Sequence, residues 1–466
     1  SLSGELSADG RLHLNGFGSD QGATVAQLQA FLLNAELVTL KNNRLMLTMP
    51  SGEIRDMSLN LLLSRQGSAR RVEAKLSSTS GTHISVLAEG VGDPLRPDFF
   101  TGQAYLDIQV SDLGAVNDLV ADRQPVVSAD GAVDVEFWLD WKMGRSSVEA
   151  RLEGRDLLIT HTESLRQVPV DRVAFKAKLL QRENRWTLFI SDLESETGDV
   201  ALALPRLQLD VLDGALRIRA ADIPLEPLSA IFVDTEPLSE KLRAVVSELQ
   251  PRGQVSLLQV GFSDVNQLAR DWEVEANFEE VTVNAVKGAP GITAATGYIN
   301  LMPGNGFVVL DSQLLTLDFP PIYHAPLHFY DLYGTLHLNW DADNVTLSSG
   351  LLTTQGEEGT VKALLGLNIP RRPSDSGIEM DLLVGLQNLH PAHRVKYMPY
   401  VLKPSLLSWL NEAIGDGVIE QGAFLWRGSF RKNAAALHTT QLAFNVADIE
   451  IDYHPQWPPL LVEKGL

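Results

Sequence analysis

Two histidines and one acidic segment come nearest to metal-binding spacing in this chain. His390 and His393 would share a helical face as ligands, but Pro391 lies between them and no third ligand is suggested. Residues 341–344, Asp-Ala-Asp-Asn, resemble the start of a calcium loop, yet the glycine and the distal glutamate of that loop are missing. We interpret the histidines as part of a solvated joint and residues 341–344 as a hairpin turn, and we expect no metal or other cofactor.

The common catalytic motifs are also missing from the sequence. It contains no G-x-S-x-G, H-E-x-x-H, P-loop or G-x-G-x-x-G pattern, and the glycines at 16–18 and 415–417 are interpreted as turns. The absence of cysteine excludes disulfides, thiolate catalysis and cysteine-bound metals, and it suits an oxidising compartment. Nothing singles out a glycosidase pair among the 59 acidic residues. We therefore expect no catalytic residues and no enzymatic activity.

Charge and hydropathy limit the possible partners. The formal net charge is −21 and the isoelectric point about 4.9, so nucleic acid and electrostatic adsorption onto an anionic membrane are disfavoured. The hydrophobic content of 44% is enough for a large core. No run of about 18 apolar residues predicts a membrane-spanning helix. The first and last residues carry no targeting signal or terminal cap, so we expect a piece of a longer protein.

An apolar residue at every second position is the dominant pattern, and it restarts many times. Between Val133 and Trp141 the apolar residues alternate with Asp134, Glu136 and Asp140. In a strand this spacing gives one apolar face and one polar face. The question is whether the protein itself or a ligand covers the apolar face. The same alternation occurs at residues 12–14, 173–179, 186–190, 272–278 and 336–340.

Turn-forming residues separate the alternating segments at short intervals and predict an antiparallel meander. Short helices are expected at residues 24–33, 237–249 and 403–414, packed against the ends of the sheet. A loose repeat predicts stacked modules with approximate bounds 1–105, 106–215, 216–379 and 380–466. The turn segments are residues 8–10, 50–52, 129–131, 212–214, 302–306 and 341–344.

The eight tryptophans are spread along the chain, and most of them fall in predicted strands. This distribution excludes a single localised aromatic pocket. It indicates either a very long core or a very long apolar surface.

A family resemblance is carried by residues 397–430. This segment has a Tyr-Met-Pro entry, an amphipathic helix with Trp409-Leu410, a strand led by Gly417, and a Leu-Trp-Arg-Gly exit at 425–428. Together with residues 223–228 and 249–253 it resembles the AsmA-like family of Gram-negative bacteria, which includes TamB and YdbH. The resemblance implies a periplasmic protein tethered to the inner membrane by a helix outside this sequence. It also implies a long open β-groove that carries phospholipid passively between the inner and outer membranes.

The pattern and the resemblance together predict a mainly β fold: an elongated antiparallel sheet curled into an open hydrophobic groove, with a few short helices. The expected partners are phospholipid acyl chains, an inner-membrane anchor outside the sequence, and an unidentified partner on the outer-membrane side. A helix containing Leu406, Trp409, Leu410 and Ile414 is a candidate gate or cap. The candidate groove-lining residues are Val133, Val135, Phe137, Leu139, Phe175, Trp186, Leu188, Leu207, Leu209, Trp272, Val274, Phe278, Leu336, Leu338 and Leu382.

Two other readings stay open. A structural or adhesive β-sandwich or solenoid would bury its apolar faces against one another and purify without lipid. A polysaccharide-processing β-protein would need a cleft with paired carboxylates and aromatic side chains on the polar face. Most tryptophans here share a face with aliphatic residues, which argues against the second alternative.

Overall fold

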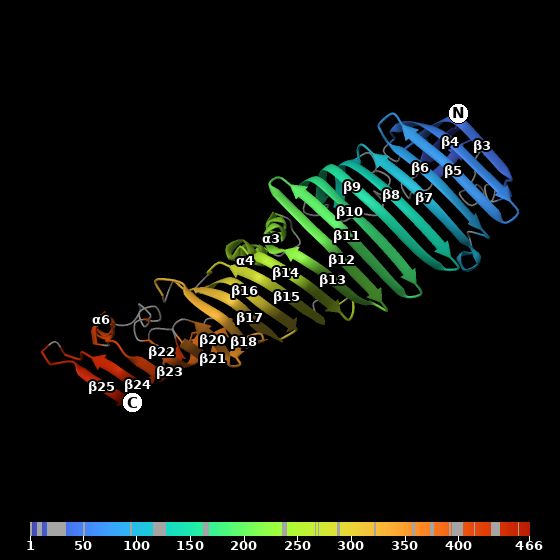
Figure 1. Ribbon diagram of the computed structural model, residues 1–466. Coiled ribbons are helices and arrows are strands. Elements are labelled where there is room, and N and C mark those ends of the chain that lie inside the picture. The colour runs from blue at the N-terminus through green and yellow to red at the C-terminus, as the bar shows by residue number, and fades with distance from the viewer. Residues whose placement is uncertain are drawn as a thin grey trace. The chain divides into compact units, whose positions relative to one another are not determined.

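The chain folds into two compact units, Ser1–Ala220 (unit 1) and Ala221–Leu466 (unit 2). The structure is a computed structural model (Figure 1). It describes residues 2–6, 12–15, 34–49, 52–93, 96–114, 127–161, 167–234, 240–265, 267–268, 270–286, 289–320, 323–356, 359–372, 377–390, 393, 404–413, 415–429, 439–454 and 456–466.

Unit 1 is an antiparallel meander. Strand β1 pairs antiparallel with β2 and parallel with β3, and from β3 to β12 each strand pairs antiparallel with the next. The strands are β1 (Leu2–Leu6), β2 (Leu12–Asn15), β3 (Leu37–Thr48), β4 (Ile54–Gln66), β5 (Ala69–Ser78), β6 (His83–Val91), β7 (Thr101–Val110), β8 (Val127–Lys142), β9 (Arg145–His161), β10 (Gln167–Arg182), β11 (Arg185–Thr197) and β12 (Val200–Leu212).

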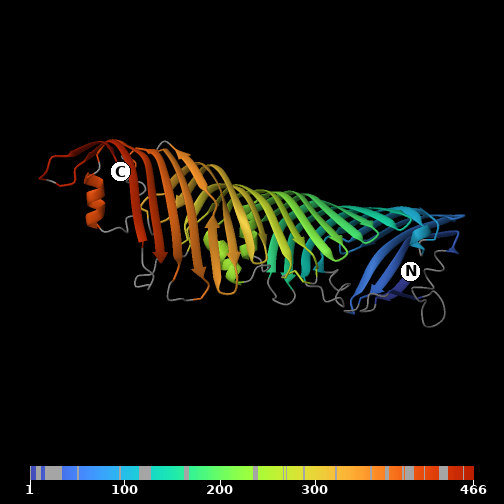
Figure 2. The ribbon, with the colours of Figure 1, turned by 90° about the horizontal axis from the view of Figure 1, so that it is seen from below.

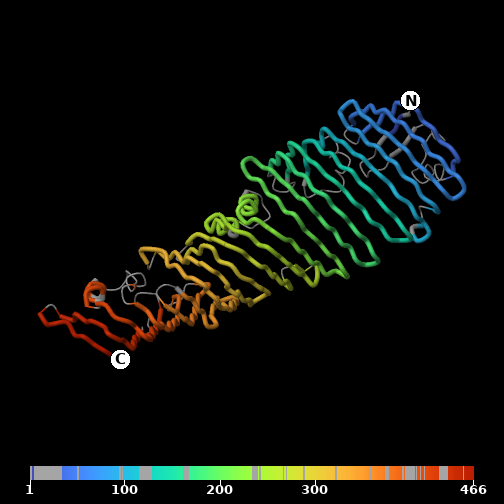
Figure 3. The backbone as a smooth tube through the Cα atoms, viewed as in Figure 1, coloured from blue at the N-terminus to red at the C-terminus, as the bar shows by residue number. Residues whose placement is uncertain are grey.

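Strand β13 (Ala215–Pro224) crosses the division, and unit 2 continues as a second run of antiparallel strands. Strand β18 pairs with both β19 and β20, and these two both pair with β21. The remaining strands pair in chain order, as the tube in Figure 3 shows. They are β14 (Arg252–Phe262), β15 (Trp272–Val283), β16 (Gly291–Met302), β17 (Asn305–Asp318), β18 (Leu327–Trp340), β19 (Asn344–Ser349), β20 (Leu352–Gly356), β21 (Gly359–Pro370), β22 (Glu379–Leu389), β23 (Val418–Ser429), β24 (Thr439–Ile451) and β25 (Leu460–Gly465).

The described helices are short. They are the 3-10 turn Pro97–Phe99, α3 (Leu225–Asp234), α4 (Glu240–Leu249) and α6 (Pro404–Ala413). Pro404 suits the first turn of α6, where a missing backbone N–H costs nothing. Helices α4 and α6 agree with the helices expected at residues 237–249 and 403–414, whereas α3, which contains Pro227, was not among the expected helices. That proline lies in the first turn of α3, which tolerates it. The predicted helix at 24–33 lies outside the described residues.

One predicted turn is wrong. Residues 129–131 lie inside β8, where Gly131 has φ 114° and sits beside Asp156, which has φ 51° on β9. The pairing register shifts between Asp130 and Ala132, so the feature is a β-bulge. By contrast, the turn at 212–214 is confirmed, with Asp213 at φ 48° and Gly214 at φ 85° between two strands.

Bulges recur in the strands of both units. Other left-handed residues inside strands include Asp192, Glu280, Asn388 and Asp448. A bulge bends its strand and increases the local twist. Figure 2 shows the strands of each unit bent into an arch, so each sheet is curved across its strands. The mainly β, antiparallel fold with a few short helices is therefore confirmed.

Candidate functional site

The strand register gives unit 1 one continuous apolar face. Residues paired directly across two strands project on the same side of a sheet. From Leu139 on β8 the pairing leads through Val148 on β9, Leu179 on β10 and Leu188 on β11 to Leu209 on β12. We call this side the apolar face of unit 1. The predicted lining residues that lie on it are Val133, Val135, Phe137, Leu139, Phe175, Trp186, Leu188, Leu207 and Leu209.

The apolar face of unit 1 continues toward the N-terminal strands. Phe137 pairs with Leu106 on β7, and the register leads on through Val86 on β6 and Ala74 on β5 to Leu61 on β4. These residues were not among the predicted ones. The alternation with a period of two is present there as well. Met57, Leu59, Leu61 and Leu63 alternate with Ser58, Asn60 and Leu62.

Unit 2 has an apolar face built in the same way. Val274 on β15 pairs with Leu301 on β16, and Ala276 leads through Ile299 and Val308 to Leu336 on β18. Leu382 on β22 lies between Leu365 and Trp426 of the neighbouring strands, which were also missed. The predicted residues that lie on this face are Trp272, Val274, Phe278, Leu336, Leu338 and Leu382.

The opposite face of each sheet is mainly polar, although Trp138 and Phe189 in unit 1 and Leu364 and Leu383 in unit 2 are exposed on it. In unit 1 it carries ion pairs such as Lys178 Nζ to Glu149 Oε1 at 2.7 Å, and Tyr105 donates a hydrogen bond to Glu136 at 3.0 Å. Burial, followed by this hydrogen bond, raises the pKa of Tyr105. In unit 2, Arg427 Nε lies 2.7 Å from Asp381 Oδ1. These charged groups keep this side hydrated.

The apolar faces are only partly shielded from solvent. Fourteen of the fifteen predicted lining residues are half-buried, and Trp186 is 41% exposed. Only sixteen hydrophobic side chains of the described residues are buried, and the largest fully buried side chains are serines. A β-sandwich with apolar faces packed together would bury far more of them.

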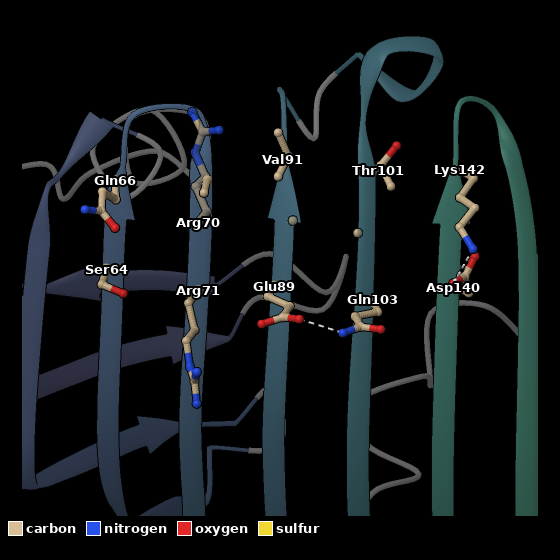
Figure 4. Close-up of a pocket in the computed structure, with 13 residues that line it drawn as sticks. Ser64, Gln66, Arg70, Arg71, Glu89, Val91, Thr101, Gln103, Asp140 and Lys142 are labelled. Carbon is tan, nitrogen blue, oxygen red and sulfur yellow. Dashed lines mark hydrogen bonds and ion pairs between the residues drawn. The ribbon is translucent and has the colours of Figure 1, made fainter.

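A polar depression lies on the polar face of unit 1, near the hairpin ends of β4 to β8 (Figure 4). Gln103 Nε2 donates to Glu89 Oε1 at 2.6 Å, and Lys142 Nζ lies 3.2 Å from Asp140 Oδ2. These groups satisfy one another. The depression is therefore a set of ion-paired and hydrogen-bonded surface side chains.

The candidate gate helix is α6. Trp409 is 46% exposed, and the last residue of α6, Ala413, accepts a hydrogen bond from the N–H of Asp452 at 2.8 Å. The side chains of Leu406 and Leu410, and all of Ile414, lie outside what the structure describes. The helix is thus joined to the end of β24, and its role as gate or cap stays a prediction.

The metal-like segments behave as structural features. Asp341 Oδ1 accepts hydrogen bonds from the N–H groups of Asp343 at 2.8 Å and Asn344 at 2.7 Å, which lowers the pKa of Asp341. This hairpin turn joins β18 to β19, as the sequence predicts. The rings of His390 and His393 pack edge to face with centroids 6.2 Å apart. Within the described part of the chain, no group of three acidic or histidine ligands could hold a metal ion.

Comparisons with known proteins give one match. A family model described as "YhdP protein" matches residues 6–465. No curated protein and no solved structure matches the chain.

Proposed function

Because the chain belongs to the YhdP family, we propose that it carries phospholipids along its apolar faces between the inner and outer membranes of a Gram-negative envelope. Residues 397–430 resemble YhdP, a member of the AsmA-like group, and the family match over residues 6–465 confirms this recognition of YhdP. The proposal concerns the cargo and the path, and the geometry of the two faces supports it.

The observation that supports this function most strongly is the continuous, half-buried apolar face in each unit. Moving a phospholipid through water exposes two acyl chains at roughly 0.8 kcal/mol per CH₂, which gives a barrier on the order of 20 kcal/mol. An apolar surface that shields the chains removes most of that barrier. The ion-paired opposite face keeps the protein hydrated while the cargo occupies the apolar side.

The composition of the faces suits passage better than storage. Their lining is mostly Leu, Val, Ile, Phe and Trp, which contact acyl chains through non-directional dispersion and burial. Fixed hydrogen-bonding groups would create a deep well at one position and hold the lipid there. A lipid on this lining therefore meets similar binding free energy at successive strands, and the function requires no catalytic group.

The proposed location is the periplasm, with a tether to the inner membrane outside these residues. None of the described helices has the length and apolarity needed to cross a membrane. The absence of cysteine agrees with an oxidising compartment.

Lipid extraction tests the proposal. The chain is purified without detergent and extracted with organic solvent, and the extract is analysed by mass spectrometry. We expect phospholipids at one or more molecules per chain, well above the amount in a β-sandwich protein of similar size purified in parallel. An extract without lipid, together with no detergent bound to the chain when detergent is added, would favour the structural or adhesive alternative.

A further inference from the structure

The two ends of the strands in unit 1 differ in charge. We define the first rim as the connections β4–β5, β6–β7, β8–β9, β10–β11 and β12–β13, together with the two strand residues on each side of each connection. The second rim is defined in the same way from the connections at the other strand ends, β3–β4, β5–β6, β7–β8, β9–β10 and β11–β12. Among the described residues, the charged side chains of the first rim are Arg65, Arg70, Arg96, Lys142, Arg145, Arg182 and Arg185 against Asp93, Asp98, Glu183 and Asp213. Those described on the second rim are Arg55 against Glu53, Asp112, Glu196 and Asp199.

Three hairpins of the first rim place two basic residues directly opposite each other. The pairs are Arg65 with Arg70, Lys142 with Arg145, and Arg182 with Arg185. Like charges directly opposite each other on neighbouring strands destabilise a sheet. The arrangement recurs at three of the five hairpins of the first rim, so an anion that lies between the paired side chains would offset a repeated cost.

One member of each pair already has a partner within the protein. Lys142 lies 3.2 Å from Asp140, Arg185 lies 3.6 Å from Asp210, and Arg70 donates to the carbonyl oxygens of Ser68 and Gly92. In each pair the other member forms no ion pair within the described part of the chain. These three side chains, Arg65, Arg145 and Arg182, are the ones available to an external anion.

The first rim also borders the apolar face. Trp141 and Trp186 lie on that face at the ends of their strands, whereas the neighbouring pairs Lys142–Arg145 and Arg182–Arg185 project from the polar face at the same strand ends. Arg65 and Arg70 project from the apolar face itself. Tryptophan suits a boundary between apolar and wet surroundings, and long basic side chains reach outward from such a boundary. Acyl chains on the apolar face would place a headgroup at this level.

We propose that the first rim of unit 1 binds the phosphate groups of lipids whose acyl chains lie on the adjacent apolar face. This inference rests on the proposed function and adds the position and chemistry of the headgroup. Guanidinium groups bind phosphate oxygens through paired, charge-assisted hydrogen bonds. The described residues of the second rim have an acidic excess, which repels the same group.

Two lipids that differ only in phosphate test the inference. The affinities of the chain for pyrene-labelled phosphatidic acid and for diacylglycerol with identical acyl chains are measured by transfer from vesicles. The test variant combines Arg65→Gln, Arg145→Gln and Arg182→Gln. We expect about a tenfold loss of affinity for phosphatidic acid and less than about a twofold change for diacylglycerol.

The matched control combines Lys41→Gln, Lys75→Gln and Arg206→Gln, which removes the same charge from exposed strand positions away from the first rim. It should leave both affinities within about twofold. Equal loss in both variants would show a general charge effect and overturn the inference, as would displacement of phosphatidic acid by equimolar inorganic phosphate. If the native chain binds neither lipid, the proposed function fails. If it binds both equally and the rim variant changes nothing, only the rim assignment fails.

Discussion

The face on which a side chain projects decides its role. Phe137 and Phe189 are both phenylalanines in long strands of unit 1, but the register places Phe137 on the apolar face and Phe189 on the polar face. Phe189 pairs with Lys178 and Gln208, whereas Phe137 pairs with Leu106 and Ala150. The same residue type is therefore expected to matter for cargo at one position and to matter little at the other.

Replacing each phenylalanine with aspartate separates the two faces. Phe137→Asp puts a charge where acyl chains would lie, so we expect phospholipid recovered with the chain to fall about tenfold. Phe189→Asp adds the same charge to a surface that is already polar and should leave recovery within about twofold. Both variants are to be checked for native circular dichroism. Equal recovery from the two folded variants would contradict the assignment of the faces.

Most elements could be predicted from the sequence because a period of two fixes both the strand and its face. The alternation at residues 133–141 therefore predicted Phe137 as a lining residue, and the register places it on the apolar face of unit 1. The alternation at residues 272–278 did the same for Val274 and the apolar face of unit 2. Other elements could not be separated by local signals. The Asp-Gly at 130–131 has the composition of a turn, yet long-range pairing with β9 makes it a bulge. Pro227 suggests an irregular joint, although its position in the first turn is compatible with α3.

The bulge at Gly131 can be tested for its contribution to the stability of the sheet. Gly131 has φ 114°, and a Cβ there would lie 2.4 Å from the carbonyl oxygen of Asp156, whereas Gly67 has φ 63° with open space around it. Gly131→Asn should destabilise the chain by about 2 kcal/mol or more, because both backbone strain and a clash oppose it. Gly67→Asn is expected to cost less than about 1 kcal/mol, because asparagine tolerates this left-handed turn. Thermal unfolding of the two variants checks the difference, and equal melting temperatures would count against a structural role for the bulge.

At the scale of the molecule, each unit combines an apolar face, a polar face and a low number of buried side chains. The charge of −21 is carried by a chain whose described charged groups mostly lie on polar faces and at strand ends. Composition alone could not show whether the hydrophobic residues form a core, because a sandwich and an open sheet can have the same alternation. The decisive information is long-range: which strands pair, and whether anything packs on the faces they create. The proposed module bounds at 105, 215 and 379 remain predictions, whereas the compact units divide between Ala220 and Ala221.

Photo-crosslinking along both units tests most directly whether the apolar faces are the lipid path. A photoreactive phenylalanine analogue is placed at Leu139 and Leu338 on the apolar faces, and at Glu136 and His337 on the polar faces, and adducts are identified by mass spectrometry. We predict phospholipid adducts at Leu139 and Leu338 and none above background at the two polar positions. Adducts of equal yield on both faces, or none at Leu139 and Leu338, would contradict the account.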